Sequence, residues 1–484
     1  MVSLMLNIRA LHVSWGKMQG VFLHRRVFTQ MKKETVTTNQ ITEGVIWKQL
    51  LLFFFPIVLG TFFQQLYNTA DTIVVGRFVS KEALAAVGGS AAQIVGLIVG
   101  FFVGLASGAS VIISQFYGAK NRVQLNRALH TAYAFSIIGS IFITVLGILI
   151  APWMLELMHT PQETMADALL YLRIYFAGII FIYNVGSSIL RAMGDSRRPL
   201  YYLIVCCILN IVLDIVLVIV FHMGVAGVSI ATIFSQGVSA VLITRALMHS
   251  DDLYQLEFRK IRFHKSALIS LIWVGCPTGI QSVLYSVTNM LIQTFLNNLG
   301  TDTVAAWSAF GKIDSLYWMV NNAFGIAITT FVGQNFGAGK YDRMKKSVRI
   351  GLCMGLCTAL TLTLIFYNFG TPLFRLFTSD ENVVSIGMQM LHHVAPAYCL
   401  FVFIELLSGA LRGTGDVVIP MLITCFGVCL LRIAWLFFIV PLSPGLNTIV
   451  LSYPVTWAIT AVMFIVYYCY QAKKWPKSSA KKTA

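Results

Sequence analysis

The sequence predicts an all-α polytopic membrane protein with twelve transmembrane helices. Of its 484 residues, 57% are hydrophobic and only 11% are charged, whereas soluble domains carry about 25% charged residues. The mean hydropathy is +0.77. A soluble fold of this size cannot bury so much apolar sequence. Twelve stretches reach the roughly 20 residues that a bilayer crossing requires.

Six spans are expected in the first half of the chain. They lie near residues 46–78, 82–117, 124–151, 162–193, 197–221 and 224–248. Each is a long apolar run, and the connections between them are short and polar. Basic residues follow the second, fourth and sixth spans, whereas Glu156 and Glu163 border the connection after the third.

Six further spans are expected in the second half. They lie near residues 265–298, 303–336, 343–370, 382–413, 418–441 and 446–472. Basic residues follow spans eight and ten, counted along the whole chain. Acidic residues such as Asp302, Asp380 and Glu381 border the alternate connections. The charged residues therefore alternate along the whole chain.

This alternation predicts the orientation in the membrane. Basic connections stay in the cytoplasm, so both termini are expected there, in a bacterial inner membrane. The net charge of +16 is explained by these connections and the lysine-rich C-terminus, and no nucleic-acid partner is expected. The basic residues are Lys120, Arg122, Arg197, Arg198, Lys260, Arg262, Lys265, Lys340, Arg343, Lys345, Lys346 and Arg412.

The expected domain organisation is two lobes with short cytoplasmic segments. Residues 1–45 form an N-terminal tail, 46–250 an N-lobe with spans one to six, 251–264 a linker, 265–472 a C-lobe with spans seven to twelve, and 473–484 a basic tail.

The N-terminal tail is not expected to be a signal peptide. Arg9, Lys17, Arg25 and Arg26 interrupt any apolar run. Met31 opens a short polar lead into the first span, so translation is expected to start there instead of at Met1.

Internal matches indicate that the two lobes arose by duplication. "LRAMGDSRRP" (Leu190–Pro199) recurs as "LRGTGDVVIP" (Leu411–Pro420), at an offset of 411 − 190 = 221. "QFYGAK" at Gln115 recurs as "QNFGAGK" at Gln334, at 334 − 115 = 219. Because six spans is an even number, both lobes enter the membrane with the same polarity. A pseudo-two-fold axis along the membrane normal is therefore expected, as in many transporters.

A polar cluster is predicted in the outer half of the N-lobe. In "LNIVLDIVLVIV", Asn210 and Asp214 share one helix face, although an aspartate at the centre of a span costs about 2.5–3.5 kcal/mol. Asp71 lies 78 − 71 = 7 residues from the outer end of its span, Asp214 lies 221 − 214 = 7, and Thr232 lies 232 − 224 = 8. These similar depths predict one site for H⁺ or Na⁺. The alternative is a hydrogen-bond network that only joins helices.

Other polar or hinge candidates lie on different spans. Gln64 and Tyr67, near Asp71, are expected to face the substrate cavity, and Pro56 is a candidate hinge in the first span. Glu405 aligns with Asn184, at 405 − 184 = 221. Arg432 lies inside the eleventh span, and a Glu405–Arg432 ion pair would offset the burial of both charges.

Several segments resemble the multidrug and toxic compound extrusion (MATE) family, and most closely its bacterial DinF-like branch. They are "FPIVLGTFFQQLYNTADTIVVGRF", "ISQFYGAKN", "NVGSSILRAMGD", "LNIVLDIVL" and "GQNFGAGK". The resemblance implies a V-shaped antiporter of twelve helices that exports organic cations, antibiotics included, in exchange for H⁺ or Na⁺.

The resemblance also implies roles for individual residues. Asp71, Asn210, Asp214 and Thr232 match the family's N-lobe cation site, and Pro56 matches its bending proline. The branch with a carboxylate in span seven matches less well, because "GIQSVLYSVTNML" (Gly279–Leu291) carries no acid.

Two functions other than export of organic cations are alternatives for this sequence. A flippase for lipid-linked oligosaccharides would share this architecture, but it would be expected to line its cavity with several basic residues. A membrane-embedded enzyme is not expected, because the sequence has no HExxH and no nucleophile elbow. It also has no GxxxxGK[ST] motif for ATP. No cofactor is expected apart from the coupling ion, and twelve helices can enclose a pathway in a monomer.

Overall fold

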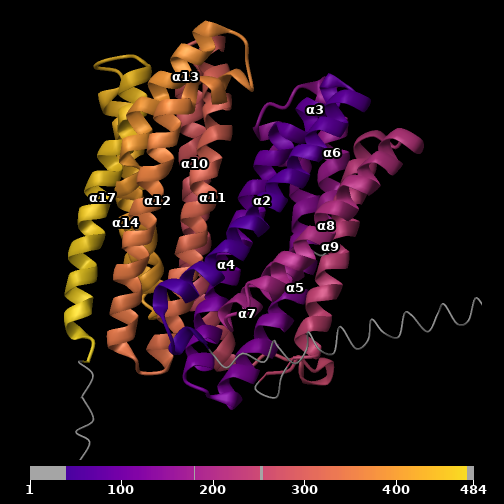
Figure 1. Ribbon diagram of the computed structural model, residues 1–484. Helices are drawn as coiled ribbons and strands as arrows, with labels where there is room; N and C mark the ends of the chain where they lie inside the picture. Colours follow the sequence, from indigo (N-terminus) through magenta and orange to yellow (C-terminus); the bar gives the residue numbers. More distant parts are fainter. Residues whose placement is uncertain (1–39, 179, 251–253, 477–484) are drawn as a thin grey trace, which may run out of the picture.

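The computed structural model describes residues 40–178, 180–250 and 254–476, and within these ranges every regular element is a helix and no strand occurs (Figure 1). The N-terminal half contains η1 (Gln40–Thr42), α2 (Ile46–Phe78), α3 (Lys81–Gly88), α4 (Ser90–Gly118), α5 (Arg122–Leu157), α6 (Gln162–Phe176), α7 (Ile180–Ala192), α8 (Arg197–Asp214), η2 (Ile215–Val220) and α9 (Gly224–Met248).

The C-terminal half repeats this order of long helices. It contains η3 (Phe258–Lys260), α10 (Lys265–Asn297), α11 (Thr301–Gly337), α12 (Tyr341–Arg375), α13 (Glu381–Val394), η4 (Ala395–Ala397), α14 (Tyr398–Gly413), α15 (Val418–Thr424), η5 (Cys425–Leu430), α16 (Leu431–Ala434), η6 (Trp435–Ile439) and α17 (Leu446–Lys474).

The predicted spans coincide with these helices. Ten continuous helical stretches of the described chain are long and apolar enough to cross a membrane, and the bent pair α6 and α7 adds an eleventh. The twelfth predicted span is α11, which has 37 residues but carries polar side chains such as Lys312, Asp314 and Asn321. The protein is therefore a multi-pass membrane protein, and its expected all-helical class is confirmed.

The duplicated motifs form the same turn in both lobes. Gly194 and Gly415, related by 415 − 194 = 221, both have a φ of +92°. In each turn the following aspartate N–H donates to a leucine carbonyl, from Asp195 to Leu190 at 3.0 Å and from Asp416 to Leu411 at 3.1 Å. This is the Schellman helix end, whose left-handed residue is usually glycine. The repeated glycine and aspartate are therefore explained by backbone geometry.

The helices form two bundles that meet at one end and diverge towards α3 and α13 (Figure 1). The first half of α2 packs in the core of the C-terminal bundle, where Leu50, Phe53 and Ile57 are buried. The first half of α10 packs reciprocally in the N-terminal bundle, through Leu271 and Val274. Each lobe thus packs the first half of the other lobe's first helix into its core. A division of the chain at residues 251–264 does not represent this exchange.

Small residues allow the lobes to meet closely along α4 and α10. A Cβ on Gly104 would lie 2.7 Å from the Cα of Gly279, and a Cβ on Gly108 would lie 2.7 Å from the Cα of Gly275. Such close backbone approach is typical of helix pairs in membranes. Because Gly104 and Gly108 lie in the second half of α4, the lobes meet at the end of α4 that leads to Lys120 and Arg122.

Candidate functional site

The predicted N-lobe cluster comes together from three helices. Asp71 lies on α2, Asn210 and Asp214 lie on α8, and Thr232 lies on α9. Their exposed fractions are 6%, 0%, 0% and 2%. The Thr232 hydroxyl lies 3.1 Å from Asp71 Oδ2, and Asn210 Nδ2 donates to the Thr232 oxygen at 3.4 Å. Asp214 lies beside Asp71. The structure therefore brings the four side chains together, while their role in ion coupling stays a prediction.

The local helix geometry explains how Asp214 reaches this position. Asn210 and Asp214 are four residues apart, so they project from one face of α8. Asp214 is the last residue of α8, and the six residues of η2 that follow form a π-helix. Wider π turns inside α-helices are frequent at functional sites. Here the change of helix type begins directly after the buried carboxylate.

The cluster has more acceptors than donors. Asp71 Oδ1, Asn210 Oδ1 and both carboxylate oxygens of Asp214 are buried and accept no hydrogen bond from any described residue. A buried acceptor without a partner costs about 1–3 kcal/mol. Such oxygens suit a small cation, which prefers oxygen ligands, or a proton held between two neighbouring carboxyl groups. The donor set therefore fits both Na⁺ and H⁺.

The other N-lobe candidates are placed less uniformly. Tyr67 is buried one turn from Asp71, and its hydroxyl accepts a hydrogen bond from Gln236 Nε2 at 3.5 Å. Gln64 is exposed, and its neighbour Gln65, not Gln64, lines the larger cavity described below. Tyr67 packs in the N-lobe core and does not line that cavity either. Neither residue therefore lines the C-lobe cavity, and their role in substrate binding stays a prediction.

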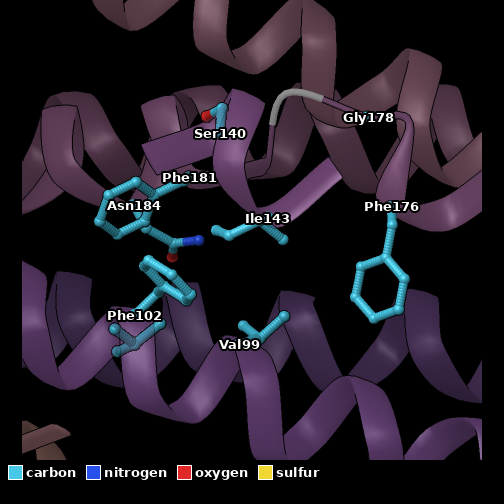
Figure 2. A pocket seen from close by; sticks show the side chains of 9 residues that line it. Val99, Phe102, Ser140, Ile143, Phe176, Gly178, Phe181 and Asn184 are labelled. Atoms are coloured by element: carbon cyan, nitrogen blue, oxygen red, sulfur yellow. The ribbon is translucent and has the colours of Figure 1, made fainter. Parts of the chain in front are cut away.

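Asn184 lines a small cavity inside the N-lobe (Figure 2). Its other walls include Val99, Phe102, Ser140 and Ile143, and its volume is about 20 Å³. That space suits one water molecule and no organic substrate. Asn184 is therefore not placed in a substrate-sized space in this conformation.

A much larger cavity lies in the C-lobe. Its volume is about 530 Å³, within the range of small-molecule sites. Thr61 and Gln65 of α2 contribute to one wall, and the remaining lining residues come from the C-terminal half. Glu405 and Arg432 both line it, while their role in substrate binding stays a prediction.

The suggested ion pair between Glu405 and Arg432 is wrong. Glu405 Oε1 instead accepts from Arg412 Nη2 at 3.1 Å. Arg412 lies seven residues further along α14, two turns away on the same face, so the two long side chains can meet. Arg432 is stacked on Tyr453, with its Cζ 3.8 Å from the ring centroid, and Nη2 donates to Thr456 at 3.0 Å.

Asp314 on α11 is a polar residue that the sequence analysis missed. Its carboxylate accepts hydrogen bonds from Tyr398 Oη at 2.5 Å and from Trp318 Nε1 at 2.6 Å. The signal was available, because Asp314 is an acid inside the expected span 303–336 and intramembrane acids usually mark functional sites. The two hydrogen bonds stabilise this carboxylate beside the cavity wall formed by Trp318.

Known proteins resemble this chain over most of its length. The MatE family model matches residues 56–216 and again residues 277–438, and the two matches begin 277 − 56 = 221 residues apart. The "Probable multidrug resistance protein YoeA" of Bacillus subtilis (strain 168) is 26% identical over 457 residues, which cover 92% of this chain and 98% of that protein. The "Probable multidrug resistance protein YpnP" of the same organism is 30% identical over 395 residues, which cover 81% and 88%.

Solved structures share the fold. One described as the outward-facing conformation of a multidrug resistance MATE family transporter superposes with a TM-score of 0.84. It is 22% identical in sequence, and the alignment covers 91% of this chain and 99% of that chain.

Proposed function

Because this chain belongs to the MatE family, which is a family of membrane transporters and not of enzymes, we propose that it exports organic cations in exchange for H⁺ or Na⁺. Two similar proteins carry the name of multidrug resistance proteins, which supports small organic substrates. The observation that carries the exchange mechanism is the group of four donor-less oxygens on Asp71, Asn210 and Asp214.

The proposed coupling acts through α2. A cation or proton that enters the cluster neutralises charge on Asp71 and Asp214. Asp71 lies on the half of α2 that packs in the N-lobe, and the other half of α2 packs in the C-lobe. A change at Asp71 therefore reaches both lobes through one helix, and Pro56 provides a place for it to bend. Release of the ion on the other side resets the cycle.

The proposed orientation places the basic ends of the helices in the cytoplasm of a bacterial cell. The lobes meet at that end and diverge at the other (Figure 1), so this conformation would face outward. We propose that one chain suffices for transport, since residues of a single chain line the whole cavity.

The experiment that tests this function is ethidium movement into inverted membrane vesicles, under a H⁺ gradient and a Na⁺ gradient applied separately. The wild type is expected to accumulate dye with one gradient, and Asp214→Asn to accumulate none while inserting normally. Glu163→Gln, which removes an exposed carboxylate at the start of α6, is the matched control and should transport as the wild type does.

Normal dye accumulation in Asp214→Asn would contradict the mechanism. If neither gradient moves dye in the wild type, the same vesicles are tested with a labelled lipid-linked oligosaccharide. Movement of that lipid would replace the export of organic cations with a flippase function.

A further inference from the structure

Arg432 is a buried charge without a counter-ion. Its side chain is 3% exposed and lines the C-lobe cavity. Among the residues that the structure describes, no carboxylate oxygen lies within 4.0 Å of its guanidinium. Breaking a buried ion pair by removing one partner is strongly destabilising, so a lone buried guanidinium requires a reason to be retained.

The acidic residues in and beside the cavity do not supply a counter-ion for Arg432. Glu405 is paired with Arg412, with 22% and 16% of the side chains exposed, respectively. The two carboxylate oxygens of Asp314 accept hydrogen bonds from Tyr398 and Trp318. These two carboxylates therefore have partners of their own, and the guanidinium of Arg432 keeps its charge at the cavity wall.

Hydrogen-bond donors without acceptors gather at the same wall. A guanidinium has five N–H groups, and the one acceptor that the described residues give Arg432 is Thr456 Oγ1. Arg432 Nε is buried and donates to none of them, and the same holds for Trp457 Nε1. Trp457 lines the cavity too. A ligand that fits these donors must bring acceptor oxygens.

Aromatic rings form much of the remaining wall. Trp318, Phe401, Tyr453 and Trp457 all line the cavity, and neighbouring rings in this set contact one another at centroid distances from 4.6 to 6.1 Å. Rings of this kind stack on planar ligands. The guanidinium of Arg432 already covers one face of Tyr453. A ligand with an anionic group and an aromatic ring could therefore contact the guanidinium and the neighbouring rings of the wall at the same time.

We propose that the C-lobe cavity binds aromatic molecules that carry a phosphate or carboxylate, with the acid group on Arg432 and the ring against the tryptophans. Guanidinium groups pair with both anions through two parallel hydrogen bonds. The inference rests on the proposed export function and deepens it, since the substrates would then include acids and zwitterions as well as cations. The two lobes would have opposite polarity, with the acid cluster in one and the guanidinium in the other.

The test is a fluorescence titration of the purified protein, in nanodiscs of phosphatidylcholine, with flavin mononucleotide. Riboflavin has the same ring system without the phosphate and serves as the matched ligand. Flavin mononucleotide is expected to bind at least about tenfold more tightly than riboflavin, because hydrogen bonds to charged groups contribute about 1.5–3 kcal/mol.

Substitutions of Arg432 test whether this residue causes the difference in affinity between the two flavins. Arg432→Gln should bind the two flavins equally, and Arg432→Lys should keep part of the preference. Arg375→Gln removes a half-exposed arginine that pairs with Glu381 at the end of α12 and should bind as the wild type does. A cooperative thermal unfolding transition shows that a variant is folded. If Arg432→Gln does not fold, the reduced preference for flavin mononucleotide in Arg432→Lys still tests the proposal.

Three outcomes would overturn the proposal. They are no binding of flavin mononucleotide, equal binding of both flavins by the wild type, and displacement of flavin mononucleotide by short-chain phosphatidylglycerol, which would make a lipid headgroup the ligand. Flavin binding is measured at equilibrium without an ion gradient, so it does not require the ion coupling on which dye export depends. A failure of ion-coupled dye export is therefore distinguishable from a failure of this site.

Discussion

Thr232 is the residue that connects the N-lobe cluster. Its hydroxyl can donate to Asp71 Oδ2 at 3.1 Å or to the Val228 carbonyl at 3.0 Å, and its oxygen accepts from Asn210 at 3.4 Å. A single hydroxyl proton serves only one of the two acceptors at a time. Thr232 can therefore release Asp71 when a cation or proton reaches that carboxylate, without leaving its own donor unpaired.

Replacing Thr232 by valine is expected to strengthen binding of the coupling ion at Asp71 while keeping the side-chain shape. The change removes the hydroxyl that donates to Asp71 Oδ2 and leaves that buried oxygen without a donor, at about 1–3 kcal/mol, so a bound cation or proton is favoured more. The ion concentration for half-maximal dye export should therefore fall about tenfold. Thr232→Ser keeps the hydroxyl and should remain near the wild type. An unchanged ion dependence in the valine variant would show that Thr232 only joins helices.

At the scale of elements, α2 and α10 are related by the duplication and cross between the lobes in the same way. Each has an internal proline, Pro56 and Pro277, at 277 − 56 = 221. Ile57 of α2 is still buried in the C-lobe core and Tyr67 already in the N-lobe, whereas α10 passes from Val274 in the N-lobe to Ile292 in the C-lobe. Both prolines therefore lie at or near the crossing, where a bend would change the angle between the lobes.

Pro277→Ala is expected to slow transport several-fold, as Pro56→Ala should, because a restored backbone hydrogen bond stiffens the crossing helix. Equilibrium binding of dye should change little. The measurement is the initial rate of ethidium accumulation in inverted vesicles. Pro152→Ala, in α5, is the matched control, since Pro152 is also internal to a helix. Equal rates in all three variants would show that the two prolines are static kinks.

The fifth and eleventh spans also change helix type at corresponding places. The π-helix η2 begins at Ile215, after Asp214, and η6 begins at Trp435, which corresponds to Asp214 at 435 − 214 = 221. The Trp435 indole donates to the Thr448 carbonyl at 2.8 Å. The duplicated geometry is therefore kept in both lobes, although the acid is present in only one.

At the scale of the whole molecule, the lobes are joined at the basic end by a reciprocal pair of hydrogen bonds. Gln115 Nε2 donates to the Gly413 carbonyl at 2.9 Å, and Gln334 Nε2 donates to the Ala192 carbonyl at 2.7 Å. The acceptors are related by 413 − 192 = 221. Each glutamine thus binds the duplicated helix end of the other lobe, and the two bonds must break before the lobes can separate at this end.

Gln115→Leu and Gln334→Leu are expected to favour separation at the basic end, and to do so equally. Each loses one buried interlobe hydrogen bond, a net contribution of about 1 kcal/mol, or roughly fivefold in the equilibrium. Hydrogen–deuterium exchange over residues 113–121 and 332–340 should become faster by about that factor. Gln293→Leu loses only a bond to Asn297 within α10 and should not change exchange there. Faster exchange in one variant alone would contradict the reciprocal arrangement.

Much of this molecule follows from the sequence, because the relevant signals are local. Whether a stretch crosses the membrane depends on its own hydropathy, so the twelve spans could be predicted without knowledge of their neighbours. The duplication is visible because the turns at Gly194 and Gly415 require the same residues. The depth of Asp71, Asp214 and Thr232 follows from counting residues along straight helices, and the structure brings these side chains together.

The tertiary structure decided what depends on how helix faces meet. Glu405 could reach a basic residue on its own helix or on another, and only packing placed it with Arg412 and left Arg432 at the cavity wall. Depth along a helix does not define the direction in which a side chain points, so Gln65 and not Gln64 lines the cavity. The exchange of α2 and α10 between the lobes is likewise invisible to hydropathy, because an apolar helix is equally apolar in either core.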